Sequence, residues 1–101
     1  MNRSPMQRAD LQLSPLAVPP LARNADLSLN AVENARLIRH LEQGGIRFLM
    51  YGGNANFYQA QLSEYEALLR MLDELSSERT WVIPSVGPDF GKMMDQVVTL
   101  K

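Results

Sequence analysis

The feature that most constrains this chain is an apolar segment, residues 46–51, that runs directly into a loop rich in glycine and asparagine, residues 52–56. Most residues of the segment are large and apolar, and Phe and Tyr favour a pleated surface, so it predicts a buried strand. Gly52 and Gly53 allow backbone angles that a side chain forbids, and they leave peptide N–H groups uncovered. In α/β proteins, ligands bind on loops at the carboxyl ends of parallel strands. We therefore expect the fold to be organised around this strand and its loop.

Two further segments have the character of strands. Residues 16–18 are apolar and stop at Pro19 and Pro20, which cannot donate to a sheet ladder. Residues 80–86 are rich in β-branched and aromatic side chains, although Pro84 indicates a bulge or the end of the strand. The strands then begin near residues 16, 46 and 80, and spacings of about 30 residues are typical of βαβ crossovers. The sequence predicts an α/β fold with a parallel sheet and a regular β/α repeat.

A helix is predicted after each strand. Ser28 is a suitable N-cap for the first helix, and Gly44 and Gly45 mark its end. The second begins near Leu62, which is placed for a hydrophobic staple, and its Ser63 and Glu66 have capping-box spacing. The third covers residues 92–101. The apolar stripe of the first helix is expected to be Ala31, Val32, Ala35, Leu37, Ile38 and Leu41, and the buried face of the second is expected to be Tyr65, Leu68, Leu69, Leu72 and Leu75. The third helix carries Met93, Met94, Val97, Val98 and Leu100, and its two methionines are expected to fill the core.

The first 14 residues differ from the rest of the chain. Residues 1–14 mix charge, polarity and one proline without a sustained period. We expect them to form a loosely held N-terminal arm, either a disordered leader or a segment that packs on a partner subunit. Residues 15–101 are expected to form the ordered β/α domain.

Composition excludes several classes of function. The 101 residues suffice for one domain, and ten basic and eleven acidic residues are intermixed, so we expect no nucleic-acid partner. The chain has no cysteine, which excludes thiolate catalysis and a disulfide framework. His40 falls near the end of the first predicted helix, where a cation suits the helix dipole. Because the chain has no second histidine and no cysteine, no metal or other cofactor is expected. No apolar run reaches the roughly 20 residues of a membrane span, and the N-terminus lacks the apolar core of a secretory signal. We therefore expect a cytoplasmic protein with no membrane partner.

Candidate chemistry is confined to the three loops that follow the predicted strands. The sequence contains no Ser/His/Asp set and no glycine-rich nucleotide motif. Gly52, Gly53 and Asn54 can offer consecutive N–H groups to a carboxylate or phosphate, and Asn54 or Asn56 can add a side-chain donor. Asn and Gly are also ordinary turn residues, so a structural turn and an anion site are both open interpretations.

The ionisable residues outside these loops are weaker candidates. Lys92 is expected within a helix and Lys101 is terminal, so neither follows a strand, where a buried amine could form a Schiff base. Asp89 is interpreted as a turn or cap residue and not as a catalytic base.

Four motifs occur in an order that is typical of one enzyme family. V-P-P-L at residues 18–21 resembles V-T-P-F at the end of the family's first strand. L-M-Y-G-G-N at residues 49–54 falls where the family has G-T-T-G-E or G-S-T-G-E. L-S-E-Y-E at residues 62–66 matches its L-S-x-x-E helix start, and V-I-P-S-V-G at residues 82–87 resembles V-I-A-G-V-G. From about residue 16 to residue 100, the chain thus resembles the dihydrodipicolinate synthase and N-acetylneuraminate lyase family of Schiff-base aldolases.

The resemblance implies a fold and an activity. It implies the first three units of a (β/α)8 barrel, usually assembled as a homotetramer. It also implies a lysine that forms an imine with pyruvate or another 2-oxo acid and a tyrosine that moves protons. Both belong to later strands, so 101 residues are not expected to be catalytic alone.

The same resemblance locates the substrate loop. Carried over by position, binding of the keto acid's carboxylate falls on Gly53 and Asn54, with Gly52 shaping the turn and Asn56 close by. Gly53 and Asn54 replace the family's paired hydroxyl residues. This replacement favours another aldol cleavage or a dehydration over dihydrodipicolinate synthesis, and a member that has lost the reaction is a further alternative.

Two interpretations from other classes stay open. One is a non-catalytic β/α module that acts through its surface, alone or as an oligomer. The other is a stand-alone flavodoxin-like domain that binds phosphate at residues 52–56. For the 101-residue chain alone, exposed sheet edges and incompletely covered helices predict poor autonomous stability.

Overall fold

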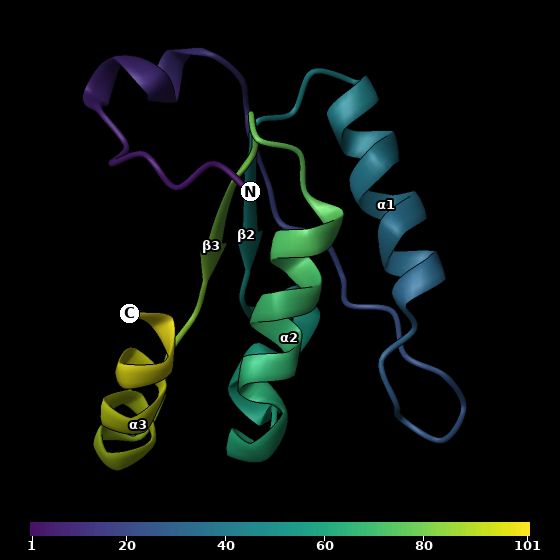
Figure 1. The fold of residues 1–101 in the computed structure, drawn as a ribbon, viewed down its shortest axis with the longest axis vertical. Coiled ribbons are helices and arrows are strands. Elements are labelled where there is room, and N and C mark those ends of the chain that lie inside the picture. The colour runs from purple at the N-terminus through teal and green to yellow at the C-terminus, as the bar shows by residue number, and fades with distance from the viewer.

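The three predicted strands form one parallel sheet in the computed structural model of residues 1–101 (Figure 1). β1 covers Leu16–Ala17, β2 covers Phe48–Tyr51 and β3 covers Trp81–Pro84. Their order across the sheet is β1-β2-β3, and both pairings are parallel. The predicted α/β class and parallel sheet are confirmed, although each strand is shorter than the apolar segment that predicted it.

A helix follows every strand, which gives three consecutive β/α units. α1 covers Ala31–Gln43, α2 covers Leu62–Leu75 and α3 covers Phe90–Leu100. All three begin at the lower end of the view in Figure 1 and run back beside the strands. Short 3-10 helices lie at Arg8–Gln12 (η1), Gly53–Ala55 (η2) and Phe57–Gln59 (η3). None of the helices has the length and apolar character needed to cross a membrane.

One face of the sheet carries the main hydrophobic core. Leu49 of β2 lies opposite Ala17 of β1 and Val82 of β3, and Tyr51 points to the same face because side chains alternate along a strand. These residues pack against α1 and α2. The buried helix residues of this core are Ile38, Tyr65, Leu68, Met71 and Leu72. We call this the covered face.

The opposite face of the sheet is apolar but only partly covered, and we call it the open face. At its amino end Phe48 stacks on Trp81, with ring centroids 5.2 Å apart. Leu16, which lies opposite Phe48 in the register of the sheet, is 41% exposed, and Val18 and Met50 are 40% and 36% exposed. Parallel sheets are normally buried on both faces, so an apolar open face is unusual.

The start of α1 differs from the prediction. The N-cap is Asn30, whose side-chain oxygen accepts from the Glu33 N–H at 2.9 Å. Arg23 and Leu29 form an antiparallel bridge, so the helix has not begun at Ser28. The predicted cap at Ser28 is therefore wrong. The predicted end is confirmed, because α1 stops before Gly44 and Gly45 adopts a left-handed conformation with φ of 89°.

The buried face of α1 is also rotated from the predicted one. Asn34 is buried, and its amide accepts from the Ala22 N–H and donates to the Ala22 carbonyl at 2.8 and 2.9 Å. Ile38 is fully buried, as predicted, whereas Val32 is 66% exposed and Ala31 is exposed. A polar side chain thus occupies a position that an apolar pattern could not reveal.

α2 begins as predicted but by other contacts. Its N-cap is Gln61, and no side chain caps the first turn. Glu66 pairs with Arg70 at 2.7 Å, and Leu62 is 47% exposed, so the predicted capping box and staple are wrong. The predicted buried face is largely confirmed: Tyr65, Leu68 and Leu72 are buried and Leu69 and Leu75 are partly buried.

α3 starts two residues before the predicted helix and buries a polar residue. Gln96 is 1% exposed, and its side-chain oxygen accepts from the Gly87 N–H at 2.7 Å. Met94 and Val98 are 50% and 74% exposed, and Leu100 is 40% exposed. The expectation that the methionines of this helix fill the core is therefore wrong for Met94, whereas Met93 is partly buried.

The N-terminal arm, residues 1–14, contacts its own chain. The Trp81 indole N–H donates to the Ser4 carbonyl at 3.0 Å, and the Asn2 N–H donates to the Thr80 carbonyl at 2.6 Å. Because these contacts join the first residues to the start of β3, the prediction of a loosely held arm is wrong for residues 1–4.

Candidate functional site

The loops that follow the three strands lie at one edge of the sheet, as parallel strands require (Figure 1). The Asn54 amide donates to the Val18 carbonyl at 3.0 Å, which joins the loop after β2 to the end of β1. The Ser85 N–H donates to the Tyr51 carbonyl at 2.9 Å, which joins the chain after β3 to β2. The sequence-predicted loops are therefore neighbours in the structure.

The loop at residues 52–56 is a tight turn built on glycine. The Gly52 carbonyl accepts from the N–H groups of Ala55 and Phe57, both at 3.2 Å. The N–H groups of Gly53 and Asn54 begin η2 and take no part in its hydrogen bonds, as expected for the first residues of a helical turn. A Cβ atom added to Gly52 or Gly53 would meet no heavy atom within 4 Å. The turn therefore leaves two N–H groups outside its own hydrogen bonds, and the space beside the Cα atoms of Gly52 and Gly53 is open.

The two asparagines of this loop have structural roles. Asn54 uses one of its two amide hydrogens on the Val18 carbonyl, which leaves the second hydrogen and the amide oxygen for a ligand. Asn56 adopts a left-handed conformation with φ of 51° and ψ of 34°, which asparagine tolerates better than most residues. Both residues are exposed. The structural-turn interpretation thus holds for Asn56, while Asn54 retains free polar groups.

Buried aromatic residues hold the loop on the covered face. The Phe57 ring lies 5.9 Å from that of Tyr51 and 6.0 Å from that of Tyr65, measured between centroids. The Tyr65 hydroxyl donates to the Ser85 carbonyl at 3.0 Å and so connects α2 to the chain after β3. Burial raises the pKa of both Tyr51 and Tyr65, with the charge of Glu42 adding to the effect at Tyr51. These two phenols stay neutral and anchor the site.

An ion pair stabilises the same edge of the sheet. The Arg23 guanidinium donates to the two carboxylate oxygens of Glu64 at 2.6 and 3.2 Å. This hydrogen bonding raises the pKa of Arg23 and lowers the pKa of Glu64. Arg23 also donates to the Leu27 carbonyl at 2.7 Å, so its donors are engaged in fixing the loop after β1 to the first turn of α2.

Lys92 is the residue at this edge that sequence reasoning missed. It was expected inside a helix and away from the strand ends. Its ammonium donates to the Tyr58 carbonyl at 2.6 Å and forms no ion pair with a carboxylate. No local sequence signal marks this contact, because it joins the first turn of α3 to a residue 34 positions earlier in the chain.

Other features of the molecule give no competing site for this chemistry. No group of three or more His, Cys, Asp or Glu side chains is placed to hold a metal ion, and His40 is exposed in the last turn of α1. A groove of about 660 Å³ runs between α2 and α3 beside β3 and is lined by Leu69, Val82 and Leu100 among others. We favour the strand ends over this groove because the N–H groups of Gly53 and Asn54 take no part in the hydrogen bonds of η2 and lie after a strand of the parallel sheet.

The fold and the strand-end loops define the class of this protein as a parallel β/α protein with three consecutive units. No family model, curated protein or solved structure matches the chain. A more specific assignment rests on the order of the motifs and on the geometry of the sheet.

Proposed function

We propose that the chain forms the first three units of a (β/α)8 barrel in a lyase of the dihydrodipicolinate synthase and N-acetylneuraminate lyase type. Its role in that enzyme is to bind the carboxylate of pyruvate or another 2-oxo acid at Gly53 and Asn54, with Gly52 and Asn56 shaping the turn. The imine-forming lysine and the proton-moving tyrosine belong to later strands of such a barrel.

The observation that carries this proposal is the combination of strand order and an apolar open face. Consecutive parallel strands in the order β1-β2-β3 are the arrangement of a barrel wall, in which each strand pairs with the next. α2 contacts both α1 and α3, so the helices form one layer, as in the outer ring of a barrel. The open face, with Leu16, Val18 and Met50, then corresponds to the packed barrel interior.

The positions of the four motifs support the family assignment. Residues 18–21 follow β1, and residues 52–54 follow β2. Residues 62–66 begin α2, and residues 82–87 span the end of β3 and the chain after it. Each motif therefore lies where the family resemblance requires it, at a strand end or a helix start.

Substrate binding follows from the geometry of the turn at residues 52–56. The N–H groups of Gly53 and Asn54, together with the second amide hydrogen of Asn54, suit a carboxylate, which accepts several hydrogen bonds. Lys92 adds a positive charge near this turn through its contact with Tyr58. Neither Gly53 nor Asn54 carries a hydroxyl, so the turn binds substrate without relaying protons.

The experiment is trapping of the imine on the natural gene product. Incubation with pyruvate and borohydride is expected to add one reduced pyruvate to a lysine, detected by mass spectrometry of the intact protein. A screen of other 2-oxo acids follows if pyruvate gives no adduct. A folded barrel that traps none of these acids would contradict the lyase proposal and favour the non-catalytic module.

The sheet order also bears on the flavodoxin-like alternative. In a flavodoxin-like sheet β1 lies between β2 and β3, whereas here β2 is central and β1 is at an edge. This difference favours the barrel. Protection of the chain by inorganic phosphate, without any response to pyruvate, would reverse that preference.

A further inference from the structure

A small pocket lies at the amino ends of β2 and β3, at the end of the sheet opposite to the candidate functional site (Figure 1). Its volume is about 220 Å³, and most of its lining residues belong to residues 42–47, at the end of α1, and residues 77–80, before β3. Two of them are Arg47 and Arg79, and Glu42 is the only acidic one. Because these residues belong to consecutive units of the sheet, the pocket does not depend on further strands.

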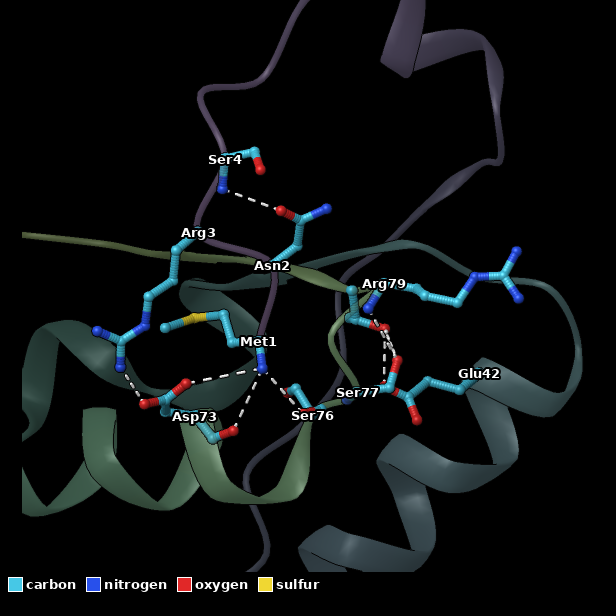
Figure 2. A network of polar contacts seen from close by, with 10 residues as sticks. Met1, Asn2, Arg3, Ser4, Glu42, Asp73, Ser76, Ser77 and Arg79 are labelled. Carbon is cyan, nitrogen blue, oxygen red and sulfur yellow. Dashed lines mark hydrogen bonds and ion pairs between the residues drawn. The ribbon is translucent and has the colours of Figure 1, made fainter.

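The Glu42 side chain joins the two walls of this pocket. Figure 2 shows it reaching from the end of α1 to the turn that follows α2. One oxygen of its carboxylate accepts from the Ser77 N–H at 2.8 Å and from the Thr80 hydroxyl at 2.7 Å. Thr80 is only 1% exposed, so one of these partners is fixed by burial. The pocket is therefore a built feature of the fold and not a gap between loose loops.

Two guanidinium groups at this pocket have no carboxylate partner. The Arg47 Nε–H donates to the Arg79 carbonyl at 3.1 Å, which leaves both terminal NH2 groups of Arg47 without a protein acceptor. The Arg79 guanidinium forms no ion pair, and no dashed line reaches it in Figure 2. The arginines that do pair with Asp or Glu are Arg3, Arg23, Arg36 and Arg70. Unused donors and positive charge thus collect at this pocket.

We propose that the pocket binds a small phosphate dianion, either free phosphate or the phosphate group of a small monoester. Guanidinium groups bind phosphate oxygens through paired N–H donors, and two of them match the charge of a dianion. A Cβ atom added to Gly45, which also lines the pocket, would meet no heavy atom within 4 Å, so there is space beside the loop. The volume of about 220 Å³ is below the range of about 300–1,000 Å³ for larger ligands, so it suits phosphate better than a nucleotide.

Glu42 limits the affinity of this site, because its carboxylate charge opposes that of a phosphate. The Ser77 N–H and the Thr80 hydroxyl offset part of this charge. With two arginines and one glutamate, the lining residues keep one net positive charge. Replacement by glutamine keeps an oxygen that can accept both hydrogen bonds and removes the opposing charge. Glu42→Gln is therefore expected to bind phosphate more tightly than the native chain.

The test is phosphorus nuclear magnetic resonance of inorganic phosphate, titrated with the natural gene product at constant ionic strength, which holds non-specific screening fixed. Saturable broadening of the phosphate signal is expected, with a Kd of about 1 mM or below. Arg47→Ala and Arg79→Ala are each expected to weaken binding about ten-fold, since each removes charge-assisted hydrogen bonds. Arg8→Ala is the matched control, because Arg8 is exposed and lies outside the pocket. Circular dichroism of each variant checks that the fold is kept.

Two further variants make the test specific to this pocket. Glu42→Gln is expected to tighten phosphate binding about three-fold, a gain that a damaged fold could not produce. Asn54→Asp, which adds a negative charge to the strand-end loop, is expected to leave phosphate binding unchanged. Loss of binding in Asn54→Asp would overturn the proposal, because the phosphate would then bind at the strand ends.

The remaining outcomes decide the proposal and the source of the phosphate. No saturable binding at up to about 20 mM phosphate, well above a millimolar Kd, would overturn it. Equal weakening in Arg8→Ala and Arg79→Ala, or weaker binding in Glu42→Gln, would overturn it as well. Glycerol phosphate is titrated in the same way. Tighter binding of glycerol phosphate than of inorganic phosphate would identify a monoester as the ligand, and the reverse order would identify the free ion.

Discussion

The two faces of the sheet carry similar side chains but have different surroundings. On the covered face, Leu49 and Tyr51 are buried under α1 and α2. On the open face, Met50 lies between them in sequence and is 36% exposed. The difference shows that β2 has the apolar composition of a strand buried on both sides, while the chain supplies helices for one side only. In the proposed barrel, the open face is buried because it faces the packed interior.

The largest expected effect on stability comes from truncating an apolar side chain on the covered face, with a similar truncation on the open face as the control. Leu49→Ala is expected to destabilise the fold by about 2–5 kcal/mol because it leaves a cavity in a fully buried site. Met50→Ala is the matched control on the open face, and we expect it to cost less than about 1 kcal/mol in the 101-residue chain. Urea unfolding followed by circular dichroism, in a stabilising osmolyte, measures both. Equal losses would mean that the open face is already packed.

The buried side chain of Asn34 tests how α1 is fixed over the covered face. Asn34→Ala is expected to cost about 1–3 kcal/mol because the partly buried N–H and carbonyl of Ala22 lose their side-chain partner. The neighbouring Glu33→Ala removes only an exposed i,i+3 pair with Arg36, so its cost should be a few tenths of a kcal/mol, about what such pairs contribute. Urea unfolding measures the free energy of unfolding of the Asn34→Ala and Glu33→Ala variants and so distinguishes the two. If Asn34→Ala were neutral, α1 would not be fixed to the chain after β1 by this amide.

The smallest effect concerns the ion pair that joins the strand-end loops to α2. The hydrogen bond from Arg23 lowers the pKa of Glu64, so the folded state binds a proton there less readily than the unfolded state. The pair therefore contributes stability above the ordinary Glu value of 4.5, and that contribution is lost as pH falls through the lowered folded value. Because both groups are about a quarter exposed, at 24% and 28%, we expect less than about 1 kcal/mol.

The measurement for this pair is stability against pH. The native chain is expected to lose more stability than Glu64→Gln between neutral pH and pH values below the ordinary Glu value. Glu66→Gln is the control, since Glu66 pairs with Arg70 at an exposed position of the same helix. Identical pH curves for the native chain and Glu64→Gln would show that the pair contributes nothing.

The sequence predicted the parts of this fold that apolar runs and glycines determine. Strand positions followed from segments such as residues 46–51, and the end of α1 followed from Gly44 and Gly45. The buried face of α1 did not follow, because Asn34 is buried by hydrogen bonds to Ala22 and carries no apolar signal. Gln96 escaped prediction for the same reason, since it is buried against Gly87.

The candidate site was predicted in part. Gly52, Gly53 and Asn54 lie together at the edge where strand ends meet, as their place after a strand indicated. The contact of Asn54 with Val18 could not be predicted, since it joins residues 36 positions apart in sequence. The approach of Lys92 to Tyr58 is likewise a result of packing between α3 and the second loop, which no local pattern encodes.

The mass of the natural gene product, measured intact, tests the barrel proposal most directly. Closing the open face needs eight β/α units and about 250 residues or more, so we expect a mass of about two and a half to three times the 11.4 kDa of this chain. The further strands would then be searched for the imine lysine. A natural product of 11.4 kDa would contradict the proposal, because the open face would have to be covered by another molecule.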